Sequence, residues 1–197
     1  MRKLLYAALL LLAVQPLNAQ DRLGFKAGGN LSLVNSDLDK TLDYDNPGVG
    51  WSAGLYYKIP VSKNWSVQPE ILYSTQQSQE TYYFSKLKLN YVQVPVLFQL
   101  RSGDKGFVFF AGPQLNFISG TKIKTKTGAE IKDNARFVQT DFGAALGLGT
   151  RPKPGHFGFD VRAFRGLTNI FKAPYDNSNK SRNTQLTISV LYAFGKK

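Results

Sequence analysis

Apolar and polar residues alternate with a period of two along most of the chain, which is the spacing of side chains on the two faces of a β-strand. In the first run Leu23, Phe25 and Ala27 share one face, while Gly24 and Lys26 share the other. Seven runs have this spacing: 23–33, 49–59, 65–74, 107–117, 141–149, 157–163 and 185–194. No stretch beyond residue 20 shows a convincing helical period, so the pattern predicts an all-β protein.

An eighth run covers 87–100 and changes phase along its length. Leu89 and Tyr91 are in one phase, whereas Val92, Val94 and the following apolar residues are in the other. A β-bulge near Tyr91 would reconcile the two halves. The count of eight is even, which lets an antiparallel sheet close with both termini at one end.

The predicted connections alternate between short and long. The short ones are 61–64, 101–106 and 151–156, and the long ones are 36–48, 77–86, 120–136 and 167–183. Short turns at one end and long loops at the other are typical of a transmembrane barrel, with the turns in the periplasm. We therefore expect an eight-stranded antiparallel up-and-down transmembrane β-barrel.

The composition of the polar face of these runs distinguishes a membrane barrel from a soluble one. A soluble barrel exposes that face to water and fills it with Lys and Glu, whereas here it is mostly Gly, Ser, Ala, Gln and Thr. The mean hydropathy of −0.24 excludes only a helical membrane bundle, and the lack of Cys excludes a disulfide framework. A soluble lipocalin-like secreted barrel that carries a small apolar ligand is the alternative.

The N-terminal segment is predicted to be a targeting signal. Arg2 and Lys3 precede an apolar core from Leu4 to Val14, and Ala19 supplies a small residue at a cleavage point. A membrane anchor is the alternative, but the apolar run is shorter than the roughly 20 residues that span a bilayer. We expect a cleaved signal peptide at 1–19 and a barrel domain at 20–197.

Short motifs in several runs resemble a known family when they are taken in order. They are Phe25–Ser32, Gln68–Tyr73, Tyr91–Leu97, Ala111–Leu115, Asp141–Gly143 with Gly147–Gly149, and Gly166–Ile170. Together they resemble the PorT-type outer-membrane β-barrel ("porin family") domain of Gram-negative bacteria. The resemblance implies an eight-stranded barrel in the cell outer membrane, and it supplies no catalytic residues.

Among the charged residues on the polar face, which would line the lumen, three are candidates for a contact across the interior: Glu70, Asp160 and Arg162. Charges in a narrow barrel are costly unless they are paired, so we expect Glu70 or Asp160 to contact Arg162. The alternative is a proton or ion relay. Because the interior of eight strands is just wide enough for side chains, we expect no open diffusion pore.

The third long loop carries Lys122, Lys124 and Lys126 at every second residue. In an extended hairpin these lysines would form a cationic ridge able to meet lipopolysaccharide phosphates or an acidic glycan. The alternative is a solvated loop edge that resists aggregation. An envelope or extracellular protein is the other partner that such loops predict.

The sequence predicts no enzyme, cofactor or metal site. His156 is the only histidine and falls in a short turn without a clustered carboxylate. A membrane-embedded acyltransferase or protease would need a Ser, a His and an acid at one rim. The acidic residues of the first long loop do not have EF-hand spacing. The formal net charge of +12 is scattered over turns and loops, and an outer-membrane location excludes nucleic acid as a partner.

Overall fold

The computed structural model describes residues 23–35, 48–79, 86–102, 106–124, 130–131, 140–151, 156–168 and 182–194. The signal peptide predicted at 1–19 and the first long loop lie outside these residues. The described part contains no helix that is long and apolar enough to cross a membrane.

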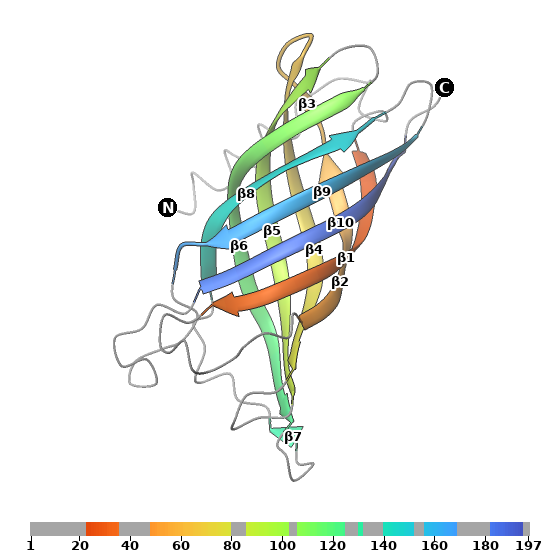
Figure 1. Cartoon of the computed structure of the whole chain (residues 1–197). Helices are drawn as coiled ribbons and strands as arrows, with labels where there is room; N and C mark the ends of the chain where they lie inside the picture. The colour runs from red at the N-terminus through yellow and green to blue at the C-terminus, as the bar shows by residue number, and fades with distance from the viewer. Residues whose placement is uncertain are drawn as a thin grey trace, which may run out of the picture.

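Eight long antiparallel strands close into a barrel, as the alternation predicts (Figure 1). They are β1 (Leu23–Asn35), β2 (Gly48–Tyr57), β4 (Trp65–Gln79), β5 (Lys86–Ser102), β6 (Phe107–Lys124), β8 (Thr140–Thr150), β9 (Phe157–Gly166) and β10 (Arg182–Ala193). The order around the barrel is β1-β10-β9-β8-β6-β5-β4-β2, and β2 pairs with β1 again. Two short strands add to it: β3 (Ile59–Pro60) pairs with β4, and β7 (Glu130–Ile131) pairs with β6.

The first and last described residues of the chain lie side by side, at the end of the barrel that carries the short connections. The Phe194 amide donates to the Leu23 carbonyl at 2.9 Å, and the Ala193 amide donates to the His156 carbonyl at 2.8 Å. At the same end the Arg101 amide donates to the Asn64 carbonyl at 2.8 Å. We call this the short-turn end and the opposite one the long-loop end.

The three strands β4, β5 and β6 are longer than the others, with 15, 17 and 18 residues against 10 to 13. They run past the rest of the barrel at the long-loop end, where β7 joins them (Figure 1). The strands therefore extend into the segments 77–86 and 120–136, which the sequence predicts as loops. Strand pairing continues to Gln79 and to Lys124, because β5 supplies a partner on each side.

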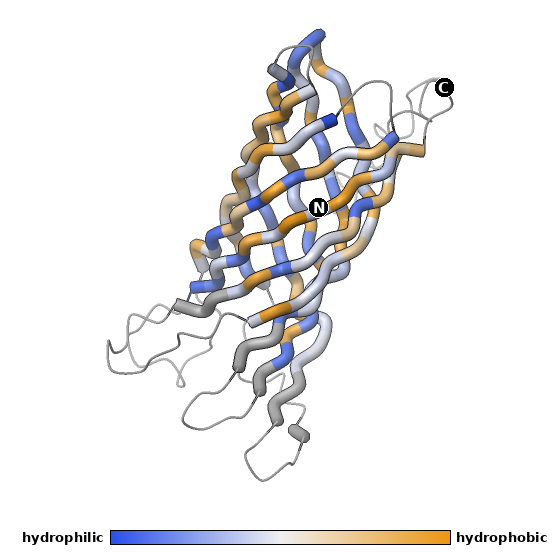
Figure 2. The backbone as a smooth tube through the Cα atoms, turned by 45° about the vertical axis from the view of Figure 1, so that its right-hand side comes forward, coloured by the Kyte–Doolittle hydropathy of each residue, from blue (hydrophilic) through white to orange (hydrophobic). Residues whose placement is uncertain are grey.

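The alternation places large apolar side chains on the outside of the barrel. Trp51 is 50% exposed, Phe109 52% and Ile188 61%, and Figure 2 shows the apolar and polar positions alternating along each strand. A water-soluble protein rarely exposes such a continuous apolar surface. An outward apolar band with a polar interior is the arrangement of a barrel surrounded by lipid.

The bulge predicted near Tyr91 corresponds to a real irregularity, but its position corrects the prediction. Asn90 pairs with Gly120 and Tyr91 pairs with Ile118, so the extra residue belongs to β6 rather than β5. The inward and outward alternation continues without a break along the described side chains of β5. Leu89 and Tyr91 therefore point into the barrel, where they are 3% and 0% exposed.

Glycines on the inner face leave space for aromatic rings. An added Cβ on Gly147 would lie 2.6 Å from a ring carbon of Phe110, and one on Gly143 would lie equally close to Phe164. Both rings belong to a buried apolar cluster with Leu97, Val108 and Ala145. Side chains from β5, β6, β8 and β9 thus fill one side of the lumen.

Candidate functional site: the lumen charge cluster

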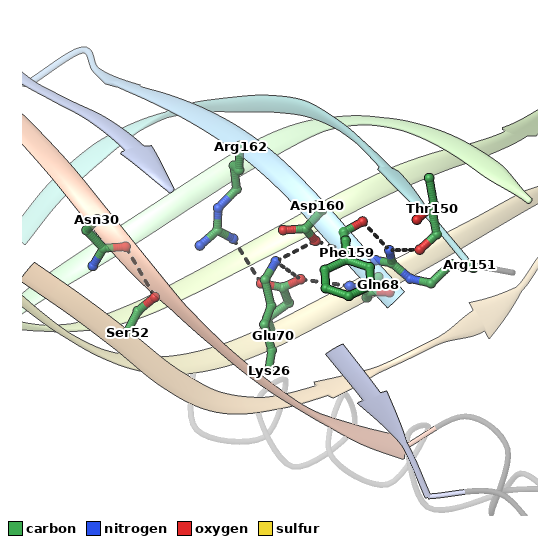
Figure 3. A network of polar contacts seen from close by, with 10 residues as sticks. All are labelled: Lys26, Asn30, Ser52, Gln68, Glu70, Thr150, Arg151, Phe159, Asp160 and Arg162. Atoms are coloured by element: carbon green, nitrogen blue, oxygen red, sulfur yellow. Dashed lines mark hydrogen bonds and ion pairs between the residues drawn. The ribbon is translucent and has the colours of Figure 1, made fainter. Parts of the chain in front are cut away.

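Glu70, in the middle of β4, is the centre of a buried polar network (Figure 3). Its carboxylate accepts a hydrogen bond from Arg162 Nη1 at 2.9 Å and one from Gln68 Nε2 at 2.7 Å. Lys26 Nζ lies 3.2 Å and 3.4 Å from the two Glu70 oxygens. One carboxylate therefore receives donors from β1, β4 and β9.

Lys26 joins Glu70 to a second carboxylate, that of Asp160 on β9. Lys26 Nζ lies 3.0 Å from Asp160 Oδ2, and Arg151 Nη2 lies 3.4 Å from the same oxygen. Arg151, which follows β8, also donates to the carbonyl oxygens of Thr150 at 2.9 Å and Phe159 at 3.1 Å. We call these five residues, Lys26, Glu70, Arg151, Asp160 and Arg162, the lumen charge cluster.

Burial makes the balance of charge in this cluster important. The side chains of Lys26, Glu70, Asp160 and Arg162 are 2% exposed or less, whereas that of Arg151 is 14% exposed. Removing an ion from water costs several kcal/mol, and only close partners of opposite sign compensate that cost. Two buried cations match two buried carboxylates, and Arg151 adds a third cation at the margin.

The contact between Glu70 and Arg162 crosses the full width of the barrel. Their strands, β4 and β9, are four positions apart in either direction around the eight strands. Gln93 on β5 and Gln185 on β10 stand in the same relation, and Gln93 Nε2 donates to Gln185 Oε1 at 2.9 Å. Two direct hydrogen bonds between opposite walls mean that side chains occupy the lumen at these levels.

Further polar contacts lie on the long-loop side of the cluster. Asn30 Nδ2 donates to Ser74 Oγ at 2.9 Å, and the Ser52 hydroxyl donates to Asn30 Oδ1 at 3.3 Å. Gln76 Nε2 donates to Gln185 Oε1 at 3.2 Å. This part of the lumen is thus polar, whereas the lipocalin-like alternative requires an apolar cavity.

Alternation along the sequence predicts part of this cluster. The structure brings Glu70 and Arg162 together as one of the two expected pairs, whereas Asp160 contacts Lys26 and Arg151 instead of Arg162. Lys26 was missed, although it lies in the inward phase of the first run, as Arg162 does in the seventh. Arg151 could not be found by alternation, because it lies just beyond the end of β8.

The predicted cationic ridge is only partly within the described chain. Lys122 and Lys124 close β6, where they pair in register with β5, and Lys126 lies outside the described residues. His156 is half-buried, and its Nδ1 lies 3.0 Å from the Ala193 carbonyl oxygen. The described residues hold no group of three or more His, Cys, Asp or Glu side chains suited to a metal ion.

A closed barrel of eight antiparallel strands, apolar outside and polar inside, defines the class of outer-membrane β-barrel proteins. Residues 17–172 match the family described as outer membrane protein beta-barrel domain. The chain belongs to this family, and its location is the outer membrane. Comparison with curated proteins finds no match.

Several solved structures share this fold at low sequence identity. Neisserial surface protein A is 12% identical with a TM-score of 0.63, over 87% of this chain and 96% of that one. Ail of Yersinia pestis is 15% identical with a TM-score of 0.51, over 88% and 98%. A second Ail structure, in complex with the heparin analogue sucrose octasulfate, is 14% identical with a TM-score of 0.50, over 87% and 97%.

Proposed function

We propose that this protein is a non-enzymatic outer-membrane barrel whose lumen is sealed by its own side chains and whose long-loop end contacts partners outside the cell. The observation that carries the proposal is the 2.9 Å hydrogen bond between Glu70 and Arg162 across the barrel. An eight-stranded barrel leaves little room beside such a contact. The lumen charge cluster then acts as a structural seal rather than as an ion or proton relay.

Because the lumen is sealed, partners bind at the surface of the barrel. Outer-membrane lipids, including lipopolysaccharide, contact the apolar band, and the loops offer a glycan or a protein partner a rigidly held surface. The complex of the similarly folded Ail with a heparin analogue supports an acidic glycan as a second kind of partner. The order of the sequence motifs supports assignment to the PorT-type branch of the family.

Conductance tests the sealed lumen directly. The refolded barrel, inserted in planar bilayers, is expected to give no stable step conductance, and liposomes that contain it are expected to retain a small dye. The double variant Glu70→Ala/Arg162→Ala removes the contact across the lumen and is expected to leak more than the native chain. Heat-modifiable migration in detergent gels checks that both barrels are folded. Stable conductance steps from the native chain would contradict the proposal.

A further inference from the structure

Four lysines come together at the long-loop end, on two neighbouring strands. The register pairs Lys88 on β5 with Lys122 on β6, and Lys86 with Lys124. Two of the four belong to a run of sequence more than thirty residues away from the others, so only strand pairing reveals the set. We call Lys86, Lys88, Lys122 and Lys124 the lysine ladder.

The ladder follows the lipid-facing side of the barrel. On β5 the outward positions from the short-turn end are Leu100, Phe98, Val96, Val94 and Val92, followed by Asn90 and then Lys88 and Lys86. The inward position between Lys88 and Asn90 is Leu89, which is buried and pairs with the buried Thr121 of β6. The backbone positions of the lysines therefore continue the same outward face that carries the apolar band.

The distance of the ladder from the apolar band places it near the outer margin of the headgroup layer. Lys88 is four residues beyond Val92, which is about 13 Å along a strand. With a strand tilt of roughly 40° this becomes about 10 Å along the barrel axis. Headgroups extend several ångströms beyond the hydrocarbon on each side of a bilayer. The backbone position of Lys88 on the outward face therefore lies near the outer margin of the headgroup layer.

Like charges that oppose each other on neighbouring strands destabilise a sheet. The structure describes three carboxylate side chains, Glu70, Asp141 and Asp160, and all three are buried inside the barrel at 3%, 1% and 2% exposure. Among the described residues, the one acidic residue that is a register partner of a ladder lysine is Glu130 of β7, opposite Lys124. In the pair closest to the apolar band, Lys88 and Lys122 oppose each other across β5 and β6, and the register partner of Lys88 on β4 is the neutral Gln77.

We infer that the lysine ladder binds the phosphate groups of lipopolysaccharide in the outer leaflet. Phosphates between the lysines compensate their mutual repulsion, and charge-assisted contacts to phosphate are strong. This inference rests on the proposed function, because it requires the long-loop end to face outward. Two arginines add positive charge to the outward face at the same end: Arg165, which is exposed, and Arg182, which is half-buried.

Binding of three probes to the full-length refolded barrel in nanodiscs tests the inference. The probes are bisphosphorylated lipid A, the same lipid without phosphates, and a heparin hexasaccharide. We expect the native chain to prefer phosphorylated lipid A, and Lys88→Gln/Lys122→Gln to weaken that binding roughly tenfold to thirtyfold. Lys88→Arg/Lys122→Arg should retain it, because the charge is kept.

The matched control removes two cations at the other end of the barrel. Lys63→Gln/Arg101→Gln acts at the short-turn end and should leave lipid A binding unchanged. Equal binding of the two lipids, or no loss in the ladder variant, overturns the inference. Binding of the hexasaccharide in place of lipid A also overturns it and assigns the ladder to a glycan. Because the seal is judged by conductance, failure of the ladder is distinguishable from failure of the proposed function.

Discussion

The lumen charge cluster and the lysine ladder are two groups of charged residues that differ in their burial and in the sign of their neighbours. In the cluster, cations and carboxylates alternate at 2.9 to 3.4 Å and are almost fully removed from water. In the ladder, lysine opposes lysine on adjacent strands at the margin of the apolar band. The cluster is compensated within the chain, whereas among the described residues the only acidic register partner of the ladder is Glu130 of β7.

This difference separates the parts of the barrel that hold it together from the parts that meet other molecules. Buried charges tolerate no loss of a partner, because no water replaces it. Charges at the margin are screened by water and ions, so their net repulsion costs little. Substitutions in the two groups should therefore differ greatly in their effect on folding.

The largest effect is expected from Glu70→Ala. This substitution leaves Lys26 and Arg162 buried with only Asp160 as a nearby carboxylate, which should lower the free energy of unfolding by about 3–5 kcal/mol. Urea titration of the refolded barrel in lipid vesicles, followed by tryptophan fluorescence, measures the change. In Glu70→Ala/Arg162→Ala, Lys26 keeps Asp160, so the double variant should be more stable than the sum of the single losses predicts. Additive losses would show that the two residues are not coupled.

How much of this cluster was predictable follows from the physics of each residue. Alternation fixes whether a residue points inward, and it placed Glu70, Asp160 and Arg162 in the lumen without a structure. Alternation does not fix the register, which decides that Lys26 rather than Arg162 reaches Asp160. The eight strands were predictable for the same reason, whereas the extensions of β4, β5 and β6 depend on pairing between segments whose polar composition resembles that of loops.

A smaller loss of stability is expected from a substitution at Gly54, where the backbones of β2 and β4 lie close together beside the cluster. Gly54 lies opposite Lys26 in the β1–β2 register, and an added Cβ would lie 2.0 Å from the Ile71 carbonyl oxygen. Gly54→Ala must therefore shift β4, the strand of Glu70, at a cost of about 1–3 kcal/mol. Gly29→Ala is the matched control, because nothing lies within 4 Å of its added Cβ. The same unfolding titration should show no loss for the control, and equal losses would contradict this account.

The ladder shows the same limit of sequence analysis at the surface. The spacing of Lys122, Lys124 and Lys126 indicated a cationic edge, but the structure places the first two on β6 within the paired sheet. Their partners Lys86 and Lys88 come from the neighbouring strand, and one sequence gives no information on which residues face each other across two strands.

The smallest effect, and the one that separates the two groups most clearly, is expected from Lys88→Glu. The substitution replaces a like-charge pair with an opposite-charge pair across from Lys122, so it should stabilise the barrel by about 0.2–1 kcal/mol. The same variant should bind phosphorylated lipid A less than the native chain does, because the ladder loses one positive charge and gains a negative one. Unfolding titration and lipid A binding on one preparation measure both quantities, with Lys63→Glu at the short-turn end as the control. A variant that is less stable and binds lipid A as before would show that the lysines do not repel each other and do not meet phosphate. A more stable variant with weaker binding is the result that only a phosphate site explains, because damage to the fold would move both quantities in the same direction.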